Sequence, residues 1–234
     1  PQVEAALREN SPERAQARAD FVRAHTWSHR HQALSAAIRE LYGQAAIVIV
    51  SYNNADYLRM CLESLWANTE YPNFRVIVVD NGSRPDVIEH LQTGASREPR
   101  LKVSLNGENL GFARANNLGL AAAGECAYVI LLNDDTVVTR GWLSKLIRHL
   151  GDPGIALVGP VTNWAGNEAQ VNLEYHSLEE MHRAAERYCH EHAGERFDIP
   201  MLAMYCLALR KSLVDAIGPL DERFGLGMFE DDDF

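Results

Sequence analysis

Acidic and amide side chains gather in four short stretches of the sequence, and each stretch follows a run of apolar residues. They are Ser51-Tyr52-Asn53, Asp80-Asn81-Gly82-Ser83, Asn109-Leu110-Gly111-Phe112 and Asn133-Asp134-Asp135. A carboxylate at the end of a buried strand can hold a hard divalent cation and leave coordination positions for phosphate oxygens and water, which is how Mg²⁺ usually binds beside a nucleotide. The pattern therefore predicts a site for a nucleotide diphosphate and a cation.

Within the last of these stretches, Asp135 is the residue that we expect to face the cation. Side chains alternate along an extended chain, so Asp134 is expected to point away from Asn133 and Asp135. Each stretch has a simpler interpretation when it is taken alone. Asp80–Ser83 is a common turn sequence, and Asn133–Asp135 could be a polar loop before the next helix. The joint pattern is much more specific than any single stretch.

Strands and helices that alternate from Ala45 onward are expected to position these residues. Strands are predicted at 46–50, 76–79, 101–105, 128–132, 155–158 and 202–209, and helices at 58–65, 86–91, 112–123, 142–150, 178–192 and 211–217. This alternation predicts an α/β fold with a mostly parallel central sheet that helices flank on both sides. Ligands bind beyond the carboxyl ends of the strands in such sheets, where the polar stretches fall.

Residues 1–43 differ from the rest of the chain in composition. They are rich in Ala, Arg, Glu and His and contain no strand-like run, while Ser11-Pro12-Glu13 is a favourable helix start. We expect two or three helices that end near Gly43. The predicted organisation is a helical appendage at 1–43 and a domain at 45–234.

Composition excludes several classes of protein. The 234 residues include 22 Lys and Arg against 32 Asp and Glu, a net charge of −10 that disfavours nucleic-acid binding. No apolar run approaches the roughly 18 residues of a membrane span, so no transmembrane segment is predicted. The four cysteines, Cys61, Cys126, Cys189 and Cys206, lie far apart and form no CxxC pair. Free thiols fit a reducing cytoplasm.

Five motifs, in order, resemble the motif set of glycosyltransferase family 2. They lie at 47–53, 78–83, 109–119, 131–136 and 229–233. The resemblance covers roughly residues 45–234 and is closest to rhamnosyltransferase-like members, which act on bacterial surface polysaccharides. It implies a GT-A fold, a nucleotide-sugar donor and inversion at the anomeric carbon.

The resemblance also implies roles for individual residues. Asn133-Asp134-Asp135 matches the DXD metal motif, and the Asn at its first position leaves Asp135 as the main ligand of Mg²⁺ or Mn²⁺. Glu230-Asp231 matches the ED motif, whose Asp is the catalytic base. The implied nucleotide-sugar-binding residues are Ser51, Tyr52, Asn53, Asp80, Asn109, Gly111, Asn116, Asn133 and Asp134.

The expected function is an inverting, metal-dependent glycosyltransferase at the inner face of the cell membrane. Its donor is a UDP- or dTDP-sugar, and its acceptor is a glycan or a lipid-linked glycan. One alternative is a sugar-nucleotide pyrophosphorylase, although residues 51–54 contain no basic residue for a phosphate loop. The other alternative is a non-catalytic module that binds a nucleotide-sugar.

The two ends of the sequence lead to a further expectation. Residues 18–41 weakly resemble the C-terminal helices of a GT-B glycosyltransferase domain, which implies a second transferase domain upstream; the alternative is an ordinary helical linker. The chain starts at Pro1 without a Met and stops at Phe234 within an acidic run. We therefore expect a segment of a longer protein, truncated near the C-terminal end of the transferase domain.

Overall fold

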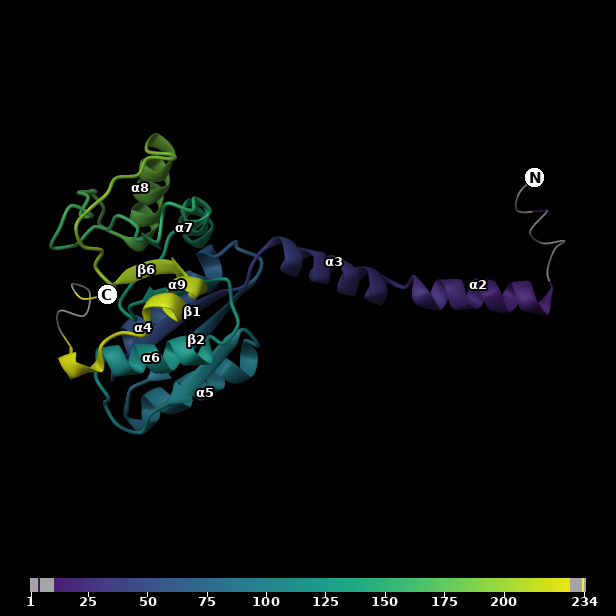
Figure 1. Cartoon of the computed structure of the whole chain (residues 1–234), viewed down its shortest axis with the longest axis horizontal. Coiled ribbons are helices and arrows are strands. Elements are labelled where there is room, and N and C mark those ends of the chain that lie inside the picture. Colours follow the sequence, from purple (N-terminus) through teal and green to yellow (C-terminus); the bar gives the residue numbers. More distant parts are fainter. Residues whose placement is uncertain (1–3, 5–10, 228–232, 234) are drawn as a thin grey trace. The chain divides into compact units, whose positions relative to one another are not determined.

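The computed structural model describes residue 4, residues 11–227 and residue 233. The chain forms two compact units, Pro1–Tyr42 and Gly43–Phe234. The second unit contains the sheet and all the loops considered below (Figure 1). Among the described residues, no helix combines the length and the apolar character that crossing a membrane requires.

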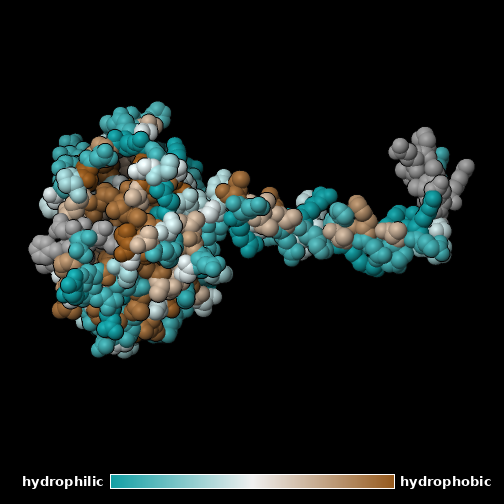
Figure 2. Space-filling view, viewed as in Figure 1, coloured by the Kyte–Doolittle hydropathy of each residue, from teal (hydrophilic) through white to brown (hydrophobic). Residues whose placement is uncertain are grey.

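The first unit consists of the helices α2 (Pro12–Ala24) and α3 (Trp27–Leu41). Each begins at a side-chain cap: the Ser11 hydroxyl accepts from the Arg14 amide, and the Thr26 hydroxyl accepts from the His29 amide. Neither helix buries a residue. Apolar side chains are therefore visible along their surface (Figure 2), and Trp27 is 83% exposed.

The second unit is built on a six-stranded sheet. Its strands are β1 (Ala45–Ser51), β2 (Phe74–Asp80), β3 (Leu101–Leu105), β4 (Tyr128–Leu132), β5 (Leu157–Val158) and β6 (Cys206–Arg210). They lie in the order β3-β2-β1-β4-β6-β5. The first four strands are parallel, whereas β6 runs antiparallel to both β4 and β5. The predicted mostly parallel sheet is confirmed.

Helices cover both faces of the sheet because the central strands are apolar on both sides. The helices are α4 (Ala55–Asn68), α5 (Pro85–Arg97), α6 (Phe112–Ala122), α7 (Trp142–Leu150), α8 (Leu178–Glu191) and α9 (Lys211–Ile217), followed by a 3₁₀ turn, η1 (Glu222–Phe224). Ile47 and Ile49 of β1 share one core with α4, α5 and α7. Ala46 and Val48 share the other core with α6 and α9 (Figure 1).

Several predicted elements differ from the structure in their extent; the helix expected at 58–65, for example, spans Ala55–Asn68. The strand expected at 155–158 is only Leu157–Val158, because the Ile155 amide donates to the Asp152 carbonyl in a turn. The strand expected from 202 begins at Cys206. The short helix expected at 86–91 continues to Arg97, since Gly94 lies inside it rather than ending it.

The close approach of α6 to β1 leads to a stability prediction. A Cβ atom at Gly119 of α6 would lie 2.2 Å from Val48 Cγ1, and Val48 is buried on the central strand. Valine has little freedom to rotate away. We expect Gly119→Ala to lower the free energy of unfolding by about 1–3 kcal/mol, the usual cost of overpacking, although alanine favours helix. Urea unfolding followed by circular dichroism measures this change.

Gly94→Ala provides a matched control for this experiment. Gly94 also lies in a helix, but its nearest neighbour would be Leu101 Cδ2 at an ordinary 3.5 Å. We expect this substitution to leave stability unchanged or to raise it by up to about 1 kcal/mol. A gain in stability from both substitutions would contradict the tight contact between α6 and β1.

Candidate functional site

The loops that follow β1, β2 and β4 meet at one edge of the sheet. β1 pairs in parallel with β2 on one side and with β4 on the other, and Ser51 lies opposite Asp80 in the register. The chain continues from β1 toward β3 on one side and returns at β4 on the other. Such a switch point opens a crevice for ligands at the carboxyl ends of the strands.

Asp80 is fully buried and has one unsatisfied oxygen. Its Oδ2 accepts from the amides of Gly82 (3.3 Å) and Ser83 (3.0 Å), whereas Oδ1 has no hydrogen-bond partner among the described residues. The turn requires glycine, because Gly82 has φ +88° and a Cβ there would lie 2.6 Å from the Glu108 backbone. A buried acceptor without a partner is costly, so Oδ1 can gain a bond from a donor on a ligand.

The loop after β1 is locked against the loop after β2. The Asn53 amide donates to Ser83 Oγ at 2.8 Å, and Asn53 Oδ1 accepts from the Arg84 amide at 2.9 Å. Asn53 itself adopts a positive φ of 55°, which asparagine tolerates better than most residues. Tyr52 is exposed, and the buried Ser51 hydroxyl has no hydrogen-bond partner of ordinary geometry among residues 11–227. Ser51 and Asp80 thus place two unsatisfied oxygens on paired strand ends.

Asn81 is a residue that our sequence analysis quoted within a motif but did not select. It is only 3% exposed, and its amide group contacts four groups of the loop after β3. Oδ1 accepts from Asn106 Nδ2 (3.1 Å) and the Leu110 amide (3.0 Å), while Nδ2 donates to Asn109 Oδ1 (2.8 Å) and the Gly111 carbonyl (3.3 Å). Asn81 therefore fixes Asn109 and Gly111 beside the Asp80 turn.

Gly111 brings the chain near the C-terminus onto the start of α6. Its φ is +84°, and a Cβ there would lie 2.0 Å from the Gly225 carbonyl oxygen. The next residue, Phe112, donates its amide to the Leu226 carbonyl at 3.3 Å. Any side chain at position 111 would displace this segment. Asp231, the predicted base, lies outside the residues that the structure describes.

The predicted site residue Asn116 lies within α6 rather than in a loop. It is buried, and its side-chain Nδ2 donates to the Phe112 carbonyl at 3.0 Å, one turn earlier in the same helix. The adjacent Asn117 makes the longer-range contacts: it donates to the Leu220 carbonyl (2.8 Å) and accepts from the Leu220 amide (2.9 Å). Asn117 thus tethers the segment before η1 to α6.

The two acids after β4 occupy different surroundings. Asp134 is half-buried, and its Oδ1 accepts from Asn54 Nδ2 at 3.0 Å, whereas Asp135 is exposed. Asn133 is half-buried, and its backbone N–H donates to the carbonyl of Tyr205, just before β6, at 2.8 Å. The sequence analysis did not select Asn54, because its contact spans 80 residues of sequence.

Burial and charge shape the electrostatics of this loop. Burial raises the pKa of Asp134, the nearby Ser51 hydroxyl and the hydrogen bond from Asn54 oppose the rise, and the charge of Asp135 adds to it. Burial, with help from both carboxylates, raises the pKa of the adjacent Cys61 thiol to about 12, so Cys61 stays protonated at neutral pH.

The oxygen donors of this edge fit a divalent cation that is shared with phosphates. Within the described part of the chain, no three or more His, Cys, Asp and Glu side chains are grouped to hold a metal ion. Mg²⁺ in nucleotide sites commonly uses only one or two carboxylates, together with phosphate oxygens and water. Asp135 and Asp134 supply such carboxylates, and their mutual repulsion favours a cation between them and a diphosphate.

Relatives of known sequence extend these observations. A pre-mycofactocin glycosyltransferase of Mycobacterium tuberculosis is 34% identical over 185 residues, a match covering 77% of this chain and 36% of the relative. An O-antigen biosynthesis protein of Myxococcus xanthus is 30% identical over 117 residues, covering 50% of this chain and 9% of the relative. The chain thus spans well under two thirds of the length of either protein.

Solved structures of low sequence identity share the fold. A mannosyltransferase of Pyrobaculum calidifontis, solved with GDP-Man and Mn²⁺, superposes with a TM-score of 0.59 at 18% identity over 82% of this chain and 57% of its own. GalNAc-T7, solved with UDP, GalNAc and Mn²⁺, gives a TM-score of 0.62 at 16% identity over 82% of this chain and 40% of its own. Both are glycosyltransferases, so the α/β unit has the predicted GT-A fold.

The sequence model of glycosyl transferase family 2 matches residues 46–218, from the first residues of β1 to the end of α9. This match favours a transferase over the alternative of a sugar-nucleotide pyrophosphorylase. It covers well over half of the chain, and the predicted resemblance is confirmed. The chain belongs to glycosyl transferase family 2.

Proposed function

We propose that this protein catalyses inverting, divalent-metal-dependent sugar transfer from a UDP- or dTDP-sugar to a hydroxyl of a glycan or a lipid-linked glycan, in the synthesis of bacterial surface polysaccharide. One observation carries the proposal: the ends of β1, β2 and β4 bring the unsatisfied Asp80 oxygen and the Asp134–Asp135 carboxylates to the same edge. Nucleotide ligands and Mn²⁺ in the structural neighbours support it, as does the O-antigen protein among the relatives.

The donor nucleotide is held mainly by residues of the first two loops. Asp80 Oδ1 accepts a hydrogen bond from the base or the ribose, and Ser51, Tyr52 and Asn53 line the other side of that position. The loop containing Asn109 and Gly111, which Asn81 holds in place, closes the site beside the Asp80 turn. Asn133 and Asp134 flank the diphosphate.

Asp135 would hold Mg²⁺ or Mn²⁺, and Asn54 fixes the neighbouring Asp134 through a hydrogen bond. When bound, the cation offsets the negative charge that develops on the departing nucleoside diphosphate. Asp231 removes the proton from the acceptor hydroxyl, whose oxygen forms a bond to the anomeric carbon from the face opposite the breaking bond to phosphate. A general base of this kind contributes a factor of roughly 10²–10⁴ to the rate.

We place the reaction in the cytoplasm, at the inner face of the cell membrane. The four cysteines are free thiols in the structure, which supports a reducing compartment. Residues 1–43 would serve as a helical linker or as the tail of an upstream transferase domain. The remaining alternative is a non-catalytic module, which would bind a nucleotide-sugar without turnover; calorimetry beside a turnover assay distinguishes the two.

The first prediction concerns the cation. We expect Asp135→Ala to weaken Mn²⁺-dependent binding of UDP at least about tenfold, or ~1.4 kcal/mol, because an exposed carboxylate after β4 is lost. Asp134→Ala should have a smaller effect. Titration calorimetry with and without Mn²⁺ measures both. Asp215→Ala is the matched control, since Asp215 pairs with Lys211 at the opposite edge of the sheet. Equal losses for Asp134 and Asp135 would contradict the assignment.

The second prediction concerns the nucleoside. Asp80→Asn keeps an oxygen for the Gly82 and Ser83 amides but places an NH₂ group where Oδ1 lies, so a ligand donor meets another donor. We expect UDP affinity without metal to fall about tenfold, with little change in the melting temperature. Asp86→Asn, an exposed acid in the first turn of α5, is the control. If UDP affinity is unchanged in Asp80→Asn, Asp80 does not contact the nucleoside and only stabilises the turn.

The third prediction concerns the base. We expect Asp231→Asn to lower transfer by at least about 10²-fold while Mn²⁺-dependent UDP binding is retained, because the amide cannot accept the hydroxyl proton. Product formation from a panel of UDP- and dTDP-sugars measures transfer, and calorimetry measures binding. If Asp231→Asn stays active and Asp232→Asn or Asp233→Asn does not, the base lies elsewhere in the acidic run.

A further inference from the structure

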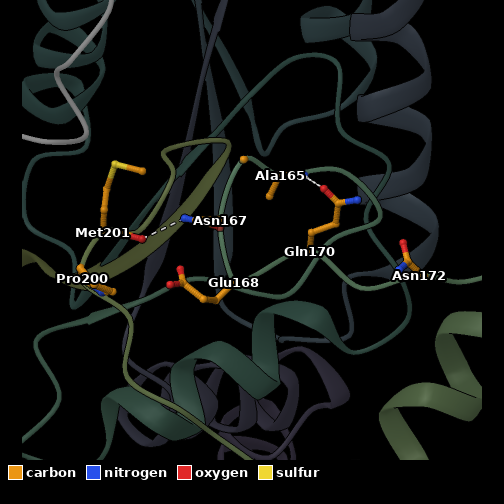
Figure 3. Close-up of a pocket in the computed structure, with 8 residues that line it drawn as sticks. Ala165, Asn167, Glu168, Gln170, Asn172, Pro200 and Met201 are labelled. Carbon is orange, nitrogen blue, oxygen red and sulfur yellow. Dashed lines mark hydrogen bonds between the residues drawn. The ribbon is translucent and has the colours of Figure 1, made fainter.

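A hollow lies between two segments of the connection from β5 to β6 (Figure 3). Its volume is about 890 Å³, within the range of small-molecule sites. It is lined by Ala165, Gly166, Asn167, Glu168, Gln170, Asn172, Pro200 and Met201. None of these residues belongs to the proposed donor site.

Tyr205 connects this hollow to the loop that carries Asp135. The Tyr205 carbonyl accepts from the Asn133 amide at 2.8 Å, and its hydroxyl donates to the Pro160 carbonyl. Pro160 begins the loop that lines the hollow, and Val158 and Ala208 pair across β5 and β6. The hollow therefore lies on the same edge of the sheet as the end of β4, where a second substrate can meet the donor.

Two side-chain amides of the hollow, those of Asn167 and Gln170, form hydrogen bonds within the walls of the hollow. Asn167 Nδ2 donates to the Met201 carbonyl at 3.0 Å, and Asn167 Oδ1 accepts from the Ala169 amide at 3.1 Å. Gln170 Oε1 accepts from the Ala165 amide at 3.2 Å. The bond between Asn167 and Met201 joins the two segments, and the other two bonds hold residues 165–170 in shape; Figure 3 draws the Asn167–Met201 and Ala165–Gln170 bonds.

Glu168 is the charged group that remains available in this wall. It is exposed, and its carboxylate forms no hydrogen bond or ion pair with another residue of the described ranges; in Figure 3 it extends toward the Pro200 side of the hollow. No Lys or Arg is found among the described residues that line the hollow. A carboxylate without a basic partner repels phosphate and accepts hydrogen bonds from hydroxyl groups, so the lining suits a neutral, polyhydroxylated ligand better than a nucleotide.

An aromatic surface directly precedes the lining residues. Trp164 is 80% exposed and is adjacent in sequence to Ala165. A large aromatic ring with a polar N–H suits a ligand with one apolar face and one wet edge. A pyranose has both, since its C–H groups form an apolar face and its hydroxyls project from the rim.

We propose that this hollow binds the acceptor glycan, with Glu168 accepting hydrogen bonds from neighbouring hydroxyls and Trp164 packing against a sugar face. The inference rests on the proposed function, which requires an acceptor beside the donor. The sugar of the donor is also a neutral, polyhydroxylated group, and the experiment below distinguishes it from the acceptor glycan.

The test is an array of bacterial O-antigen and capsular oligosaccharides, probed with the whole labelled protein. We expect some glycans to be retained, and Glu168→Gln and Trp164→Ala each to weaken their binding at least about tenfold. Glu174→Gln and Trp27→Ala are the controls: Glu174 is exposed and does not line the hollow, and Trp27 is an exposed tryptophan of the other compact unit. The controls should bind like the unmodified chain.

A second arm measures UDP and UDP-sugar binding by calorimetry with Mn²⁺. Glu168→Gln should leave both affinities within about twofold. The proposal is overturned if no glycan is retained, or if Glu168→Gln and Trp164→Ala both bind glycans normally. It is also overturned if Glu168→Gln weakens the binding of UDP-sugar but not of UDP, because the hollow would then bind the sugar of the donor. Glycan retention that depends on Glu168 in a protein that fails to bind UDP would support the hollow and contradict the donor site.

Discussion

Parallel pairing of β1 with its two neighbours is the constraint on which the site depends. β1 is buried on both faces, so its register against β2 and β4 is fixed by two packed cores. Ser51 is set opposite Asp80 on one side, while Val48 is set opposite Leu131 on the other. Extending the second register by three residues brings Asp134 to the level of Ser51. The register of the sheet therefore aligns the loops that follow β1, β2 and β4.

The parts of this arrangement that the sequence predicted are those with a strong local signal. Continuous apolar runs indicated the buried strands, and the polar residues after them indicated the edge of the sheet at which the loops after β1, β2 and β4 meet. Apolar runs also indicated β5 and β6 as strands, but nothing local indicated their order and direction in the sheet. Their antiparallel pairing depends on contacts across the sheet, and the Leu202–Met204 stretch is as apolar as a strand without being one.

Contacts between loops that are distant in sequence could not be predicted from local sequence patterns. Asn81 stands in a sequence that a simple turn explains, so nothing local revealed its four contacts with the next loop. Asn116 and Asn117 are one residue apart, and a helix turns about 100° between them. Sequence spacing could not decide which of them faces the segment at Leu220; the structure assigns this contact to Asn117.

The connection between β5 and β6 has a consequence for how such a chain can change. Its two ends lie side by side, because Val158 pairs with Ala208, and Tyr205 fastens them to the end of β4. Lengthening a loop whose ends are already held together costs little entropy. The segment between β5 and β6 can therefore change in length and sequence, while the pairing of β1, β2 and β4 is retained.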